Sequence, residues 1–225
     1  MSSSHLKRVI DTRMASLGHP GADGAQAANA ATLLDHTPND VLRDRAMLLI
    51  GWAGAFRRGE VTRLVWSDLR LVEEGLVVHL RQSKTDTYHR GVDVGIPLGR
   101  SLMTCPVRAL LAWKQRMQDQ LGDAFDEQTT TCWPGIGRAG RIDISRPLSP
   151  EGLTQAIKRR VRQAGVDGRF GGRSLRAGFI STAADLELPL EMVAAQSRHA
   201  SLDNLLRYVR SDDVFRRNAA DRVGL

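Results

Sequence analysis

Residues 172–178 read Gly-Arg-Ser-Leu-Arg-Ala-Gly and contain two arginines, Arg173 and Arg176, three positions apart. The apolar residues that follow predict a helix from Arg173 to Leu186. Taken alone, an arginine before an apolar helix is usually a solvated cap. The stretch therefore has to be weighed together with other segments of the chain.

Three further segments carry charged or nucleophilic side chains: Gly54 to Val61, Ser83 to Thr85, and Ser197 to His199 with Arg207 to Arg210 following. Each segment alone is weak evidence for a function. A lysine in a hairpin connection is usually exposed, and a lone tyrosine near a C-terminus usually packs against its own domain. The order and spacing of all four segments carry more information than any one of them.

This order and spacing resemble the tyrosine recombinase (phage integrase) family. In that family an arginine lies three residues before a glutamate at the start of a helix, as Arg57 lies before Glu60. A lysine occupies a β-hairpin, which Lys84 matches. A His or Trp precedes the nucleophilic tyrosine by nine residues, as His199 precedes Tyr208.

One motif departs from the family pattern. The family's His-x-x-Arg box is Arg173-Ser174-Leu175-Arg176 in this chain, so that Arg176 fits and Arg173 replaces the usual histidine. That histidine can hydrogen-bond the phosphate and help to accept the tyrosine proton. Arginine can do the first, but a pKa above ~12 makes it a poor proton acceptor.

The resemblance implies cleavage of DNA by Tyr208 through a 3′-phosphotyrosine, without a metal ion or another cofactor. Arg57 and Arg176 would each donate a fork of hydrogen bonds to the non-bridging phosphate oxygens. Lys84 would protonate the leaving 5′-hydroxyl, and His199 would hydrogen-bond the phosphate. The predicted catalytic residues are therefore Arg57, Lys84, Arg173, Arg176, His199 and Tyr208.

The hydrophobic pattern predicts a mainly α fold with a small antiparallel β-sheet (α+β), in keeping with a tyrosine recombinase catalytic domain. Alternating apolar residues at 76–80 and 92–96 predict a hairpin. Helices are expected from about Asp40, from Arg58 to about Trp66, from Pro106, from Pro150 to Gly165, and from Leu190 to Gln196. The stretch from Gly122 to Arg146 is expected to be irregular.

Two parts of the chain differ in composition. Residues 1–37 include a segment rich in Gly and Ala and are predicted to be an extension or linker, a possible remnant of a core-binding domain. Residues 38–225 are predicted to be the catalytic domain. Family members usually carry an N-terminal helical domain that clamps DNA, and only this short extension precedes the catalytic domain here.

The formal net charge of +7 indicates a polyanionic partner, with nucleic acid first and an anionic membrane second. The resemblance implies that double-stranded DNA is the partner and that the protein forms a homo-tetramer on two DNA sites. A short amphipathic helix over Val214 to Val223 would contact the neighbouring subunit. Neither a secretory leader nor an apolar run of membrane-spanning length is present, so a cytoplasmic protein is expected.

Two basic or glycine-rich motifs have competing interpretations. Gly135 to Gly140 matches the dinucleotide fingerprint by letter, but it lacks the preceding strand and following helix, which favours a surface loop. The basic residues from Lys158 to Arg162 fit a DNA-facing strip and a solvated helix face equally well.

Three functions fit the sequence. The first is an active site-specific recombinase or integrase. The second is a truncated, non-catalytic DNA-binding relative, such as a regulator or the product of a decaying mobile element, and Arg173 and the short N-terminal extension favour it. A type IB topoisomerase shares the same chemistry. The intact Arg57, Lys84, Arg176, His199 and Tyr208 favour the recombinase.

Overall fold

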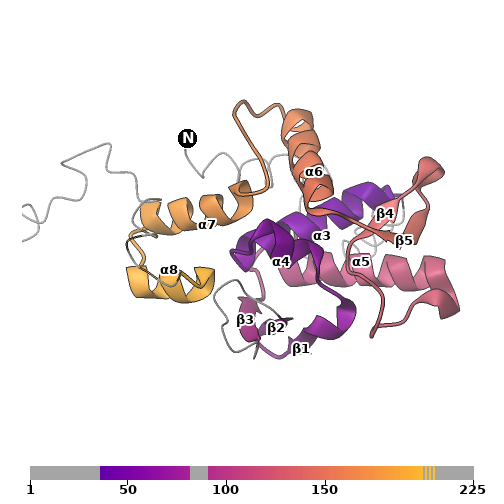
Figure 1. The fold of residues 1–225 in the computed structure, drawn as a ribbon, viewed down its shortest axis with the longest axis horizontal. Coiled ribbons are helices and arrows are strands. Elements are labelled where there is room, and N and C mark those ends of the chain that lie inside the picture. The colour runs from indigo at the N-terminus through magenta and orange to yellow at the C-terminus, as the bar shows by residue number, and fades with distance from the viewer. Residues whose placement is uncertain (1–35, 82–90, 200, 202, 204, 206–225) are drawn as a thin grey trace, which may run out of the picture.

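The fold is mainly α-helical with two small antiparallel sheets, as predicted (Figure 1). The computed structural model describes residues 36–81, 91–199, 201, 203 and 205. Its helices are α3 (Asn39–Ala53), α4 (Arg58–Thr62), α5 (Pro106–Leu121), α6 (Pro150–Gln163), α7 (Ser174–Asp185) and α8 (Leu190–Ser197). Its strands are β1 (Leu69–Val72), β2 (Gly75–Leu80), β3 (Val92–Pro97), β4 (Pro134–Ile136) and β5 (Ile142–Pro147).

Helices α3 and α5 pack against each other in the middle of the molecule, and α6 packs on α4 (Figure 1). Helix α7 contacts both α3 and α8. The apolar stripe of α3, which includes Leu42, Ala46 and Ile50, is buried in the main core. The core thus fixes α3 and α7, the two helices that flank the predicted site. In the part of the chain that the structure describes, no helix has the length and apolar character needed to cross a bilayer.

Helices α5 and α6 begin where the sequence predicts them, and each has a proline in its first turn. At α6 the Ser149 hydroxyl accepts a hydrogen bond from the Gly152 amide at 3.0 Å, which satisfies one of the open donors of that turn. At the start of α5 the Cys105 sulfur accepts a hydrogen bond from the Arg108 amide. Gly122 ends α5 with a positive φ of 51°, a conformation that favours glycine.

The predicted hairpin is strands β2 and β3, which pair antiparallel with Leu80 opposite Val92. Leu76, Val78 and Leu80 point into the core, as their alternation predicts. The structure adds β1, paired with β2. Lys84 belongs to the segment 82–90 between β2 and β3 and lies outside the described residues.

Two predictions about secondary structure are wrong. Helix α4 ends at Thr62 rather than near Trp66, because the next residues hydrogen-bond to a distant segment: the Cys132 amide donates to the Leu64 carbonyl at 2.9 Å. The stretch 122–146 is not irregular throughout, since it contains β4 and the start of β5. Gly135 to Gly140 forms the end of β4 and the turn into β5, so the strand–helix junction that a dinucleotide site requires is not formed there.

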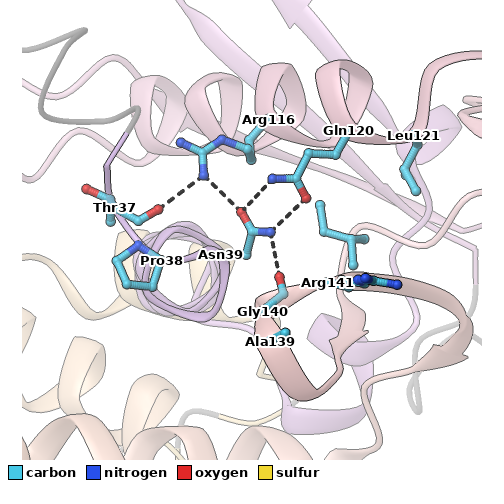
Figure 2. Close-up of a pocket in the computed structure, with 10 residues that line it drawn as sticks. Thr37, Pro38, Asn39, Arg116, Gln120, Leu121, Ala139, Gly140 and Arg141 are labelled. Atoms are coloured by element: carbon cyan, nitrogen blue, oxygen red, sulfur yellow. Dashed lines mark hydrogen bonds between the residues drawn. The ribbon is translucent and has the colours of Figure 1, made fainter.

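A polar cluster secures the N-terminal end of α3 against α5 and the β4–β5 turn (Figure 2). The Asn39 amide group donates to Gln120 Oε1 and to the Gly140 carbonyl, both at 2.8 Å. Arg116 donates to the Thr37 carbonyl at 3.1 Å and to Asn39 Oδ1 at 2.9 Å. These bonds fix the point at which the chain enters the domain.

A buried carboxylate links α3 to α6. Asp44 is fully buried, and its oxygens accept hydrogen bonds from Arg43 at 2.7 Å, Arg159 at 2.6 Å and Arg160 at 2.8 Å. Arg160 also contacts Asp40 at 2.7 Å. Part of the basic run in α6 therefore faces α3 rather than a partner.

The rest of that run is exposed. Apart from the pocket at the N-terminal end of α3 (Figure 2), the surface has a second hollow. It is lined by Lys158 and Arg162 together with Arg169 from the loop after α6. Within the described ranges none of these three cations forms an ion pair, in contrast to Arg159 and Arg160.

Candidate active site

Four of the predicted residues meet in one cavity of about 420 Å³. The α3–α4 turn contributes Arg57, the start of α7 contributes Arg173 and Arg176, and the end of α8 contributes His199. The remaining lining residues are Phe56, Arg58, Gly59 and Gly172. Arg57 lies more than a hundred positions before the other three in sequence, and the packing of α3 against α7 brings them together.

Arg57 is the N-cap residue of α4, and Glu60 holds it there. Its backbone is extended (φ −70°, ψ 151°), and its amide donates to Glu60 Oε2 at 2.7 Å. Its Nη1 donates to Glu60 Oε1, also at 2.7 Å, while its side chain remains 29% exposed toward the cavity. Burial acts to raise the pKa of Glu60, but Arg198 and Arg57 outweigh it and the pKa falls below its usual value. Glu60 is therefore a charged anchor for Arg57.

Arg176 lies in the first turn of α7 and is only 7% exposed. Its Nη1 donates to the Ala55 carbonyl at 2.9 Å, which fixes the guanidinium beneath the α3–α4 turn. Its Nη2 lies 3.3 Å from Nε2 of His199. Arg176 thus contacts both of the other segments that form the cavity.

His199 is held by Ser197 in one tautomer. The Ser197 hydroxyl donates its single proton to the Val193 carbonyl at 2.6 Å, so its oxygen can only accept from His199 Nδ1 at 2.7 Å. Nδ1 therefore carries the proton, and Nε2 presents its lone pair. Burial, followed by the charges of Arg176, Arg57 and Arg198, lowers the pKa of His199 from 6.5 to about 4, and the ring is neutral at pH 7.

Arg173 is exposed at the rim of the cavity, at the N-cap of α7. The preceding Gly172 lies so close to α4 and α6 that a Cβ there would fall 2.3 Å from Arg58 Cδ and 2.9 Å from Thr154 Oγ1. Only glycine lets the loop approach this closely, which brings Arg173 to the cavity.

The motifs did not identify Arg58, Ser197 and Arg198 as site residues. Arg58 lines the cavity and donates to Thr154 Oγ1 at 3.2 Å. The doublet Arg57-Arg58 is the one sequence signal that marks it. Lys84 and Tyr208, the other two predicted catalytic residues, lie outside the described residues.

The cavity suits a small anion with several oxygens. Arginine forks match such oxygens geometrically, and their charge does not depend on pH in the working range. Among the described residues that line it, none is acidic. Nor do three or more His, Cys, Asp or Glu side chains of the described ranges gather as metal ligands would.

The chain is similar to known proteins over most of its length. The chain is 32% identical over 196 residues to an integrase/recombinase xerD homolog from Selenomonas ruminantium, an alignment that covers 86% of this chain and 54% of that protein. The chain therefore spans about half the length of this relative.

Two solved structures share the fold. XerH site-specific recombinase, bound to a palindromic difH substrate in a post-cleavage complex, gives a TM-score of 0.65 at 14% identity and covers 100% of this chain and 52% of its own. XerA recombinase gives a TM-score of 0.63 at 16% identity, with coverages of 100% and 63%. A model described as the phage integrase family matches residues 26–214. The chain therefore belongs to the phage integrase family, and its fold is that of a tyrosine recombinase catalytic domain.

Proposed function

We propose that this chain is a site-specific DNA recombinase or integrase that cleaves and rejoins DNA through a 3′-phosphotyrosine at Tyr208. The observation that carries the proposal is the convergence of Arg57, Arg173, Arg176 and His199 on one cavity without an acidic lining residue. Membership of the phage integrase family supports it, as does the DNA substrate in the XerH structure.

In the proposed reaction the scissile phosphate occupies this cavity. The Tyr208 oxygen bonds to phosphorus, the bond from phosphorus to the 5′-oxygen breaks, and Lys84 supplies the proton to the departing 5′-hydroxyl. Arg57 and Arg176 stabilise the extra charge on the non-bridging oxygens, and removal of one such donor costs ~10²–10³ in rate. Rejoining reverses these steps, and no external energy source is needed because the phosphotyrosine keeps the bond energy.

Removal of the proton from the Tyr208 hydroxyl is the step most affected by Arg173. A phenol has a pKa of ~10, so that forming its anion at pH 7 costs roughly 4 kcal/mol. Four arginines line the cavity, and their field lowers this cost. Arg173 adds to that field and can bind a phosphate oxygen, while the tyrosine proton passes to water.

Double-stranded DNA is the proposed partner. The second hollow, between α6 and the loop that leads to Arg173, is lined by Lys158, Arg162 and Arg169, which form no ion pair with another described residue. Backbone phosphates flanking the cut site would lie there. We further propose that residues 38–225 form the catalytic domain, that residues 1–37 are an extension to it, and that the helix over 214–223 joins subunits into a tetramer on two DNA sites.

The test is covalent capture. The chain is incubated with a pool of short duplexes that carry a nick beside a randomised segment, so that the short fragment released with a free 5′-hydroxyl diffuses away. DNA that stays attached after boiling in detergent is counted and sequenced. We expect a recurring captured sequence with the unchanged chain and with Tyr88→Phe, and none with Tyr208→Phe.

A non-catalytic DNA-binding relative is the second candidate, and the arginine in place of the family's histidine favours it. This function predicts retention of specific duplexes under native conditions with no covalent product. Capture after boiling excludes it.

A further inference from the structure

Arg198 combines an unusual backbone conformation with a buried side chain. It follows α8 directly with φ 55° and ψ 48°, a left-handed conformation that glycine adopts readily and most other residues avoid. Its side chain is nevertheless long and charged, and it is only 8% exposed. The side chain therefore makes its contacts from a backbone position that glycine could also occupy.

The contacts are with the turn that carries Arg57. Nη1 of Arg198 donates to the Gly54 carbonyl at 2.9 Å, and Nη2 lies 3.4 Å from the Ala55 carbonyl. The guanidinium also lies over the Phe56 ring, 5.1 Å from its centroid. Three consecutive residues of the α3–α4 turn are thus held by one side chain from the end of α8.

The same guanidinium holds the carboxylate that orients Arg57. Nη2 of Arg198 donates to Glu60 Oε2 at 2.9 Å, and that oxygen also accepts the Arg57 amide at 2.7 Å. The other oxygen of Glu60 accepts Nη1 of Arg57 at 2.7 Å. Glu60 therefore lies between two arginines, one facing the cavity and the other buried behind it.

We propose that Arg198 is a positioning residue, which fixes the α3–α4 turn and Glu60 so that Arg57 is aimed at the cavity. Arg198 itself does not line the cavity, and both of its terminal nitrogens are engaged by oxygens of the protein. It acts through Arg57 rather than on the phosphate. The proposal rests on the proposed function, because its effect is read as DNA cleavage.

A double-mutant cycle tests this coupling. Arg198→Gly suits the left-handed backbone while removing every side-chain contact, and Arg57→Ala removes the group that Arg198 is proposed to aim. Single-turnover cleavage of a captured duplex is measured for the unchanged chain, both single variants and the double variant. We expect Arg198→Gly to slow cleavage roughly 10- to 100-fold, because small misplacements of a catalytic group have effects of that size.

In the Arg57→Ala background the same change should slow cleavage by less than about twofold, since the group it positions is already absent. Equal slowing in both backgrounds would overturn the proposal, as would unchanged cleavage by Arg198→Gly alone. Within each background, Arg198→Gly should change duplex affinity by less than about twofold, because Arg198 makes no contact with the phosphate. A loss of binding without a loss of rate on this change would also overturn the proposal.

Two further variants separate this role from folding. Glu187→Gly changes another non-glycine residue with a positive φ, 55°, away from the cavity, and should cleave at the unchanged rate. Arg198→Lys keeps the buried charge but cannot donate to Glu60 and the Gly54 carbonyl at once. We expect it to slow cleavage less than Arg198→Gly does, and to have no effect on the rate in the Arg57→Ala background. It serves in the cycle if Arg198→Gly does not fold. If the unchanged chain forms no covalent product, the proposed function fails, which is distinct from a loss confined to the Arg198 variants.

Discussion

The charge state of His199 follows from its neighbours. Three arginines and partial burial hold the pKa of this residue at about 4, and Ser197 holds its proton on Nδ1. A phosphate in the cavity would offset the arginine charges and raise that pKa. In NMR titrations of the imidazole Cε1–H signal, assigned with His199→Gln, we expect a pKa far below 6.5 for the chain alone and an upward shift with duplex DNA. A pKa near 6.5 without DNA would contradict the proposed geometry.

The same shift affects stability. Between pH 6.5 and about 4 the unfolded chain protonates His199 and the folded chain does not, so protonation favours unfolding as the pH falls through this range. The free energy of unfolding should therefore decline more steeply below pH 6.5 in the unchanged chain than in His199→Gln.

Arg173 offers a second test at the residue scale. Arg173→His introduces a group with a pKa near ~6.5 that can accept a proton, at an exposed position with room for the ring. General-base assistance is worth ~10²–10⁴ in rate, so we expect faster single-turnover cleavage. A tenfold slower rate at unchanged DNA affinity would instead show that the fixed charge of Arg173 is required.

Motif spacing predicted four residues that meet in the cavity and Glu60, which holds Arg57, but it did not predict Arg198. Arg57, Arg173, Arg176 and His199 were recognisable because the family pattern includes those positions or, for Arg173, a departure from it. Arg198 contacts Glu60 across 138 positions, and no local pattern encodes that contact. Positioning residues of this kind become visible only when the tertiary contacts are known.

At the scale of elements, the buried carboxylate of Asp44 connects α3 to α6 through Arg159 and Arg160. Asp44→Ala leaves the buried Arg43 guanidinium without its carboxylate and removes one ion pair each from Arg159 and Arg160. Loss of one partner of a buried pair typically costs about 3–5 kcal/mol. Asp40→Ala removes a carboxylate that is 37% exposed and should cost less than about 1 kcal/mol. Urea denaturation compares the two, and equal costs would show that Asp44 does not join the helices.

The elements that the sequence predicted well are those stabilised by their own pattern. Helices α5 and α6 have proline and capping signals at their starts, and β2 alternates between buried and less buried residues. The early end of α4 depends on a hydrogen bond from a remote segment, from the Cys132 amide to the Leu64 carbonyl. The short strands β4 and β5 depend on pairing with each other, with an irregular register. Periodicity over a few residues cannot anticipate such pairings.

For the whole molecule, DNA binding should depend steeply on salt. Each phosphate contact adds nearly one unit to the slope of log affinity against log salt concentration, and Lys158→Ala and Arg162→Ala should each reduce it by about one. Arg146→Ala removes an exposed arginine that already pairs with Asp143, and we expect little change. Fluorescence anisotropy from ~50 to ~200 mM salt measures these slopes, and identical slopes for all variants would exclude the second hollow as a DNA contact.

Attachment of the DNA to Tyr208 is tested most directly by mapping the covalent link. The captured complex is digested with trypsin and nuclease, and mass spectrometry locates the peptide that keeps a nucleotide. The chain has two tyrosines, so the alternatives are few. We predict a nucleotide joined through its 3′-phosphate to Tyr208. A link at Tyr88, at a serine or through a 5′-phosphate would contradict the account.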